Sequence, residues 1–151
     1  MIDIDFFKSI NDCFGHEVGD QMIVHLATLA RACKRDSDVL ARIGGEEFAL
    51  LLPETDSESA MVVAERVRAG VEAMLIVAGE KLTFNVTVSV GLYSEVPTEQ
   101  GSVEQMLKRA DLALYQSKEA GRNRITRYGD GPLRNVEPLL PAGKRNPDSA
   151  R

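Results

Sequence analysis

The stretch Arg42–Pro53 reads RIGGEEFALLLP and sets a Gly-Gly pair, followed by two glutamates, between two apolar runs. Such a pair favours a β-hairpin, because glycine takes positive φ without steric cost. The sequence therefore predicts strands over Val39–Ile43 and Phe48–Leu52. The turn itself needs no acid, and adjacent glutamates repel each other. Two interpretations stay open from this stretch alone: a solvated surface turn, or carboxylates that serve a site.

The chain alternates helical and strand-like patterns on both sides of this hairpin. Met1–Asp5 is typical of the end of a buried strand, and Leu82–Leu92 alternates and is rich in β-branched residues, so it is typical of a strand as well. Ile125–Tyr128 is typical of an edge strand. Two helices are predicted before the hairpin, over Phe6–Phe14 and Gln21–Cys33, with a polar loop between them at Gly15–Asp20. Two more are predicted after it. One starts at the capping-box pattern of Thr55 and Glu58, and the other runs from Ser102 to about Ala120. These elements predict an α/β fold with a mixed central sheet of about five strands and helices on its faces.

Composition predicts one domain over residues 1–128 and a flexible tail over 129–151, which holds four of the chain's six prolines and has no hydrophobic period. A net charge of −5 and the lack of a basic run argue against a nucleic-acid partner. Cys13 and Cys33 have no metal-ligand spacing and are expected to be reduced thiols, which suits a cytoplasmic location. No apolar stretch is long enough to span a bilayer.

Carboxylates also stand at the end of the first predicted strand. Asp3 and Asp5 are two residues apart, so they point to the same side of the strand. If this strand runs beside the hairpin, Asp3 converges with Glu46 or Glu47. Three carboxylates in one place repel one another and raise their pKa values unless a cation intervenes. Oxygen-only ligands favour Mg²⁺ or Mn²⁺, so the sequence predicts a metal site here.

Three blocks of the sequence resemble the successive signature blocks of a known family. They read DIDFFKSINDCFGHEVGD, RIGGEEF and ADLALYQSKEAGRNR. In order and spacing they are similar to the GGDEF domain, the diguanylate cyclase catalytic domain, in its GGEEF variant, from about Met1 to Tyr128. That family condenses two GTP molecules into cyclic di-GMP and releases two pyrophosphates. Its fold is similar to that of nucleotide cyclases and polymerase palm domains, which agrees with the predicted architecture.

The resemblance implies roles for the acids. Asp3 and Glu46 would be metal ligands, with the backbone carbonyl of Ile4 as a third oxygen, and Glu47 would assist a second metal or hold the site's geometry. Two Mg²⁺ or Mn²⁺ ions per half-site are expected. Glu46 is also the family's proposed general base, but a carboxylate bound to Mg²⁺ is a poorer proton acceptor, so we favour its role as a ligand. Lys8 is placed to neutralise phosphate charge in the transition state.

The family's phosphate-binding groups have counterparts in four residues. Phe6 and Phe7 lie where the chain leaves the strand for a helix, so their backbone N–H groups are predicted to meet phosphate oxygens, while their rings are expected in the core. Lys118 and Arg122, interpreted as one helical turn apart, are predicted to converge on the β- and γ-phosphates. Charge alone would leave these two cations as a solvated helix end.

The guanine base would be recognised by Asn11 and Asp20. A carboxylate accepts from guanine N1–H and the 2-amino group, which adenine cannot match, while asparagine offers a donor and an acceptor. His16 lies between them in the sequence. It is interpreted either as a nucleotide contact or as a residue that structures the loop.

An inhibitory site is implied upstream of the hairpin. Arg35-Asp36-Ser37-Asp38 matches the R-x-x-D pattern that precedes the signature in many GGDEF proteins. Arg35 would hold a phosphate or stack on a guanine, and Asp38 would accept from the guanine edge. Arg66 corresponds to a second arginine that completes this product-binding site.

The sequence departs from the family at its start. Family members normally begin earlier, with a segment resembling D-x-L-T-G-L-x-N-R, a helix and the full first strand. We therefore expect a domain that lacks its N-terminal part, with apolar surface left exposed. A regulatory domain is expected upstream, and a longer protein would have room there for a membrane tether. The reaction joins two GTP molecules symmetrically, so a homodimer of half-sites is predicted.

Other functions stay open beside the cyclase. One is a non-catalytic GGDEF module that binds GTP or cyclic di-GMP as a receptor, and another is a cyclase that makes a different cyclic nucleotide. Degenerate members usually lose signature acids, whereas this chain keeps Asp3, Glu46, Glu47 and Lys8. The retained acids favour the enzyme, and Asn11 with Asp20 favours guanine.

Overall fold

A mixed five-stranded sheet forms the centre of the computed structural model, which describes residues 1–79, 82–96 and 101–130. The strands lie in the order β2-β3-β1-β6-β7. They span Ile2–Ile4 (β1), Val39–Arg42 (β2), Glu47–Leu51 (β3), Val88–Leu92 (β6) and Ile125–Arg127 (β7). β1 is antiparallel to both β3 and β6, and β7 joins β6 in parallel at the edge. The predicted mixed sheet and its edge strand are confirmed, whereas the predicted tail lies, from residue 131 on, outside the described residues.

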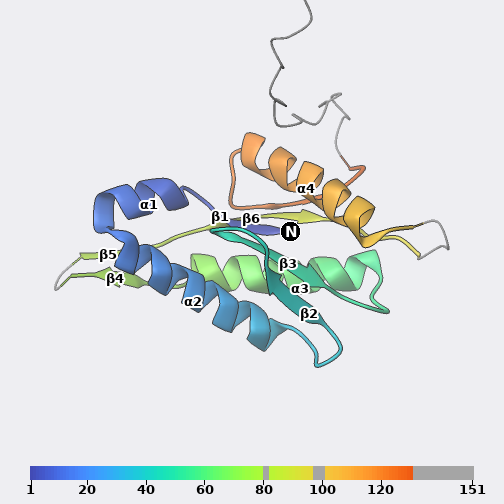
Figure 1. Cartoon of the computed structure of the whole chain (residues 1–151), viewed down its shortest axis with the longest axis horizontal. Coiled ribbons are helices and arrows are strands. Elements are labelled where there is room, and N and C mark those ends of the chain that lie inside the picture. Colours follow the sequence, from blue (N-terminus) through green and yellow to red (C-terminus); the bar gives the residue numbers. More distant parts are fainter. Residues whose placement is uncertain (80–81, 97–100, 131–151) are drawn as a thin grey trace, which may run out of the picture.

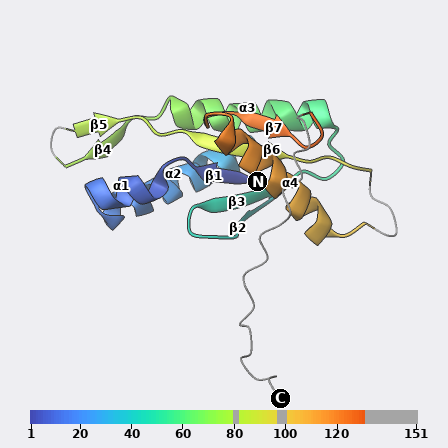
Figure 2. The same ribbon diagram turned by 90° about the horizontal axis from the view of Figure 1, so that it is seen from above.

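The described ranges contain four helices: α1 (Phe7–Phe14), α2 (His16–Cys33), α3 (Ser57–Glu72) and α4 (Val103–Glu119). Figure 1 shows α4 on one side of the sheet and α2 with α3 on the other, and Figure 2 shows the same layers from above. The main core lies on the α2–α3 side and includes Ile4, Leu26, Phe48, Val67 and Val88. In the described part of the chain, no helix is both long and apolar enough to cross a bilayer.

The alternation of side chains along β1 places an acid under α4. Ile2 and Ile4 belong to the core on the α2–α3 side, so Asp3 points to the opposite face. There it lies opposite Glu47 of β3 and Ser89 of β6. α4 approaches this face closely, because a Cβ added to Gly91 of β6 would lie 2.0 Å from the carbonyl oxygen of Ala110.

The predicted loop over Gly15–Asp20 is wrong. α2 begins directly at His16, and the break from α1 is the single residue Gly15, whose φ of 87° is accessible to glycine. Val18 and Gly19 are buried and extend the apolar stripe of α2 toward its N-terminus. The polar side chains of this segment led the sequence analysis to predict a loop where the first turn of α2 lies.

The single strand predicted over Leu82–Leu92 is also wrong. Leu82–Phe84 (β5) pairs with Ile76–Ala78 (β4) in a separate two-stranded sheet, and β6 begins only at Val88. The change of direction lies at Asn85, whose side-chain nitrogen donates to two carbonyls at the end of α3, each at 3.0 Å.

The helix ends are capped partly as predicted. Ser102 accepts from the Gln105 N–H at 3.2 Å, and α4 ends before Gly121, as the sequence indicates. The capping box of Thr55 and Glu58 is wrong, because Asp56 caps α3 instead, accepting from the Ser59 N–H at 2.7 Å.

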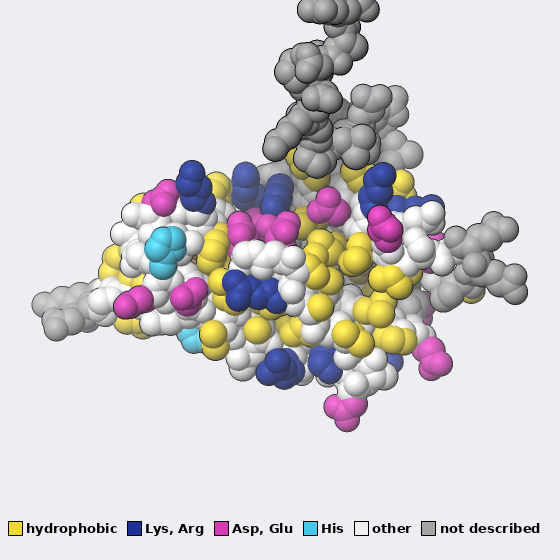
Figure 3. All heavy atoms as spheres, in the orientation of Figure 1, with side chains coloured by type: hydrophobic (Ala, Val, Ile, Leu, Met, Phe, Trp, Pro, Cys, Tyr) yellow, Lys and Arg dark blue, Asp and Glu magenta, His cyan; other side chains and the backbone are white. Residues whose placement is uncertain are grey.

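Apolar side chains are exposed between α4 and the β2–β3 hairpin. A groove of about 310 Å³ lies there. Its exposed apolar lining comes from Val39, Ile43, Leu51, Val103 and Leu107. Figure 3 shows apolar side chains gathered on this side of the molecule.

Candidate active site

The β2–β3 turn is held by backbone and arginine contacts. The N–H groups of Ile43 and Gly44 both donate to the Glu47 carbonyl, at 2.9 and 3.4 Å. The Arg42 guanidinium donates to the carbonyls of Gly44 and Gly45, the shortest contact being 2.7 Å from Nη2 to Gly45. Arg42 was missed by the sequence analysis, although a cation two residues before a turn is within reach of its carbonyls.

Gly44 provides space in the turn, and neither of the two glycines has a positive φ. The absence of positive φ corrects the reason given from the sequence. A Cβ on Gly44 would lie 2.5 Å from Glu47 Oε2, whereas one on Gly45 would meet nothing within 4 Å. Gly44 thus makes room for the Glu47 carboxylate, and Gly45 leaves the tip open to another molecule.

Asp3 shares one electrostatic environment with the hairpin acids. It is buried, and its Oδ2 lies 2.8 Å from Lys118 Nζ of α4. Burial is the main cause that raises the pKa of Asp3; the hydrogen bond and charge of Lys118 oppose the rise, and the charges of Glu46 and Glu47 add to it. Glu47 lies opposite Asp3 in the sheet, and the charges of both hairpin glutamates act on the Asp3 carboxyl. Figure 3 shows acidic side chains between α1 and α4, with Lys and Arg side chains beside them.

The donor chemistry of this cluster fits a hard cation. Its side chains offer only carboxylate oxygens, and the raised pKa of Asp3 is the strain that a bound cation relieves. Among the described residues, no set of three or more His, Cys, Asp or Glu side chains is arranged as a metal site. The cation that Asp3 contacts is instead the Lys118 ammonium.

Lys118 and Arg122 are not on one helical turn, which corrects the sequence interpretation. α4 ends at Glu119, and Gly121 and Arg122 follow in left-handed conformations with φ of 110° and 64°. Lys118 therefore points to Asp3, while the Arg122 guanidinium carbon lies 4.5 Å from the centre of the Phe6 ring. The two cations lie beside different parts of the site.

The start of α1 is open to an anion. Phe6 precedes the helix with φ of 57°, and no side chain caps its N-terminal N–H groups. The Phe6 ring is 63% exposed, so its predicted place in the core is wrong, whereas Phe7 packs against the core as expected. Lys8 is exposed in the first turn. A helix N-terminus with a nearby cation can bind phosphate.

A buried acceptor without a partner lies between α1 and α2. The Asn11 side-chain oxygen is buried and has no hydrogen-bond partner in the described part of the chain. Gly19 of α2 makes room for it, because an added Cβ would lie 1.9 Å from that oxygen. Asp20 follows Gly19 and is exposed, as is His16 in the first turn of α2. The sequence analysis missed Gly19; a glycine inside an apolar helical stripe was its only signal.

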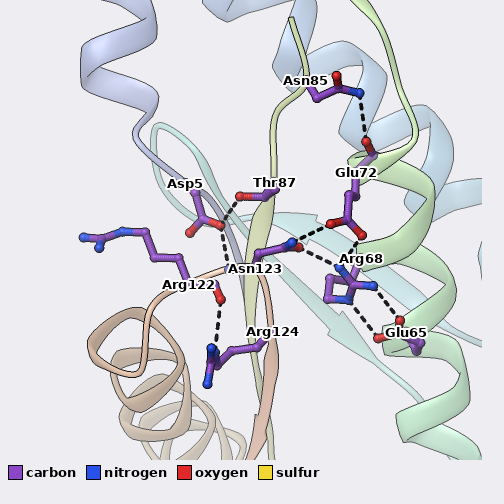
Figure 4. A network of polar contacts seen from close by, with 9 residues as sticks. All are labelled: Asp5, Glu65, Arg68, Glu72, Asn85, Thr87, Arg122, Asn123 and Arg124. Carbon is purple, nitrogen blue, oxygen red and sulfur yellow. Dashed lines mark hydrogen bonds and ion pairs between the residues drawn. The ribbon is translucent and has the colours of Figure 1, made fainter.

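Asp5 does not hold a cation in the way its position beside Asp3 suggested. It is buried, and its carboxylate accepts from the Ser89 hydroxyl at 2.7 Å. It also accepts from the Thr87 hydroxyl at 2.6 Å and the Asn123 N–H at 3.1 Å (Figure 4). Both of its carboxylate oxygens accept hydrogen bonds from neutral donors, so Asp5 has a structural role.

The R-x-x-D segment forms a tight turn after α2. The Arg35 N–H donates to Asp38 Oδ2 at 2.7 Å, and the Asp38 N–H donates to the Arg35 carbonyl at 3.1 Å. Asp38 is buried, and its Oδ1 has no partner within the described ranges. The Arg35 side chain is exposed, and so is Arg66 on α3, the helix that packs against α2.

Comparisons with known proteins point to one family. The family described as "Diguanylate cyclase, GGDEF domain" matches residues 1–124. Diguanylate cyclase A of Treponema denticola is 47% identical over 127 residues, which is 83% of this chain and 33% of that protein. The chain thus spans about a third of the length of this curated relative.

Solved structures show the same fold. The GGDEF domain of DgcB from Caulobacter crescentus, in complex with c-di-GMP, is 35% identical with a TM-score of 0.79, over 84% of this chain and 74% of that one. The active GGEEF domain of a diguanylate cyclase from Vibrio cholerae is 34% identical with a TM-score of 0.77, over 86% and 81%. The signature turn, the acids behind it and these matches lead to one conclusion: the chain belongs to the GGDEF domain family of diguanylate cyclases.

Proposed function

We propose that this domain condenses two GTP molecules into cyclic di-GMP with release of two pyrophosphates. The observation that carries the proposal is the buried Asp3 carboxylate, which shares its environment with Glu46 and Glu47 and contacts Lys118. An acid cluster of this kind, beside the uncapped start of α1, suits a reaction at the phosphates of a nucleotide.

The metal would be held by this cluster. Asp3 and Glu46 would be side-chain ligands, the Ile4 carbonyl a third oxygen, and Glu47 the support of a second ion, with Mg²⁺ or Mn²⁺ as the metal. When bound, such ions lower the pKa of an attacking hydroxyl and stabilise the leaving pyrophosphate. The chain's own contribution is to gather the carboxylates at one end of β1 and β3 and to exclude water from Asp3.

The nucleotide would be bound from phosphate to base along α1. The N–H groups of Phe6 and Phe7, with Lys8 and Arg122, would contact phosphate oxygens, and Lys118 would neutralise charge next to Asp3. Asn11 and Asp20 would recognise guanine, with His16 as a neighbouring contact. The Asn11 oxygen is a buried acceptor without a partner in the described residues, so a guanine N–H would supply the missing donor.

Replacing Gly19 by alanine is expected to weaken GTP binding about tenfold and to relax discrimination against ATP, because the new methyl group displaces the Asn11 side chain. The melting temperature should change little, since alanine favours the helix. Calorimetry with GTP and ATP checks this. Gly70→Ala in α3 is the matched control, because its methyl group meets the Leu29 side chain, outside the proposed nucleotide site. An unchanged GTP preference in Gly19→Ala would contradict the assignment of Asn11.

Product inhibition would act at the R-x-x-D turn. Arg35 and Arg66 would hold the phosphates or guanines of cyclic di-GMP, and Asp38, whose Oδ1 has no partner among the described residues, would accept from a guanine edge. The Arg35–Asp38 turn lies at the end of α2 away from α1, so product bound there need not compete with GTP.

Arg35→Ala is expected to weaken cyclic di-GMP binding by about 1–3 kcal/mol, the usual size for a lost charged hydrogen-bonding partner. Titration calorimetry of both proteins measures this difference. The GTP affinity serves as the internal control and should not change. Equal cyclic di-GMP affinity in the variant would remove Arg35 from the inhibitory site.

A homodimer is part of the proposal, because one chain carries one set of nucleotide residues and the product is symmetric. An upstream regulatory domain and a cytoplasmic location of this domain are proposed with it. The alternative is a receptor that binds GTP or cyclic di-GMP without turnover. Incubation with Mg²⁺ and GTP, followed by separation of the products, distinguishes the two, since a receptor leaves GTP unchanged.

A further inference from the structure

Asn123 connects three distant parts of the chain. It lies between Arg122 and β7, and its backbone N–H donates to Asp5 Oδ2 at 3.1 Å. Its side-chain oxygen accepts from Arg68 Nη1 at 2.6 Å, and its side-chain nitrogen donates to Glu72 Oε1 at 2.7 Å. Figure 4 shows this arrangement between the end of β1 and α3. We call Asp5, Arg68, Glu72 and Asn123 the clamp.

The clamp holds a backbone conformation that residues other than glycine rarely adopt. Gly121, Arg122 and Asn123 have consecutive positive φ values of 110°, 64° and 45°. Asparagine tolerates the left-handed region better than most residues, but arginine pays a steric cost there. Such conformations persist only where the surroundings hold them. The bonds of Asn123 on both sides of the turn supply that restraint.

Two of the three partners of Asn123 are themselves held in place, Asp5 and Arg68. The Asp5 carboxylate is buried and fixed by the hydroxyls of Thr87 and Ser89. The Arg68 guanidinium makes two hydrogen bonds to Glu65, at 2.9 and 2.7 Å, and one to Glu72 at 2.8 Å. The clamp therefore ties the turn to the sheet and to α3, two rigid parts of the domain.

The turn determines where the Arg122 side chain lies. The Arg122 N–H donates to the Ser117 carbonyl at 3.0 Å, and its own carbonyl accepts from Arg124 Nε at 3.1 Å. With both sides of its backbone held, the guanidinium extends over the Phe6 ring at 4.5 Å. This puts the cation beside the uncapped start of α1, where an anion would bind.

We propose that Asn123 is a positioning residue for the nucleotide. Through the clamp it holds Arg122 over Phe6, so that the guanidinium is already in place when the phosphates arrive at the start of α1. Asn123 itself touches no nucleotide. The inference rests on the proposed function, because it is GTP that brings the phosphates to this place.

A double-mutant cycle tests the inference in the intact chain. The dissociation constant of a non-hydrolysable GTP analogue with Mg²⁺ is measured by calorimetry for the wild type, Arg122→Ala, Asn123→Ala and the double variant. Arg122→Ala is expected to weaken binding about tenfold or more, and Asn123→Ala several-fold. If Asn123 acts through Arg122, the double variant binds no more weakly than Arg122→Ala alone.

Asn85→Ala is the matched control for loss of stability. Asn85 also makes two side-chain hydrogen bonds, to the backbone carbonyls of Glu72 at the end of α3 and of Met74 just after it, but none to Asn123 or Arg122. It should lower the melting temperature without changing the dissociation constant. If Asn123→Ala does not fold, Arg68→Gln takes its place in the double-mutant cycle, because it removes the guanidinium that donates to the Asn123 side-chain oxygen.

Each outcome decides a different claim. Additive effects in the double variant would show that Asn123 acts on the fold in general and would overturn the inference, while the proposed function would stand. A wild-type chain that binds no GTP analogue would overturn the proposed function and this inference with it.

Discussion

Glu46→Gln is expected to lower the rate of cyclic di-GMP formation by about a hundredfold or more, the usual range for loss of a group that stabilises transition-state charge or transfers a proton. Glutamine keeps the size of the side chain and removes its negative charge, so the proposed metal ligand is lost. Glu46 is only half-buried at the hairpin tip, and the backbone bonds of Glu47 hold that turn. The melting temperature should therefore change little.

The control is Glu104→Gln, which makes the same chemical change at an exposed position in the first turn of α4. Both variants and the wild type are compared by product quantification and by thermal melting, under identical Mg²⁺ and GTP concentrations. A rate close to that of the wild type in Glu46→Gln, with Glu104→Gln also unaffected, would exclude the role given to Glu46.

Asp3→Asn is expected to abolish turnover to a similar extent and yet to raise the free energy of unfolding at neutral pH. The Asp3 carboxyl is buried and its pKa is raised, so its ionisation costs the folded state more than the unfolded state. Asparagine has the same shape without the charge. Lys118 loses its partner but keeps access to water, since its side chain is 32% exposed.

The pH dependence of this gain has a defined sign. Below the ordinary pKa of aspartate, Asp3 is protonated in both states and costs the fold nothing. As the pH rises through the raised pKa of the folded state, the cost appears, so the advantage of Asp3→Asn grows from acid to neutral pH.

Denaturant unfolding at several pH values, without divalent metal, measures this advantage. Asp36→Asn, at an exposed carboxylate, should show no comparable trend. A lower stability of Asp3→Asn at neutral pH would mean that the Lys118 contact outweighs burial and that the acid cluster carries no strain.

Local sequence patterns predicted the parts of the site that lie on regular strands. The Gly-Gly turn marks the hairpin, and the two-residue period of β1 places Asp3 on one face of the sheet, opposite Glu47. The convergence of these acids follows from antiparallel pairing, which a hydrophobic pattern can indicate. Strand patterns also marked β2, β3 and β7, whereas β6 was predicted only as part of a longer strand.

The remaining features depend on contacts between residues far apart in the chain. Asp5 and Asn123 are 118 positions apart, and neither has a local pattern that indicates the other. Gly19 matters because the Asn11 side chain from another helix fills the space beside it. The sequence indicated that α4 ends before Gly121, but not that Gly121 and Arg122 adopt left-handed conformations, so Lys118 and Arg122 were wrongly placed on one helical turn.

The initial rate of cyclic di-GMP formation, measured against the concentration of this chain at fixed Mg²⁺ and GTP, tests the central claim most directly. We predict cyclic di-GMP with two pyrophosphates for each product molecule, and a rate that rises more than in proportion to protein concentration, because two half-sites must meet. GTP that binds but stays unchanged at every concentration would contradict the account and identify the domain as a nucleotide receptor.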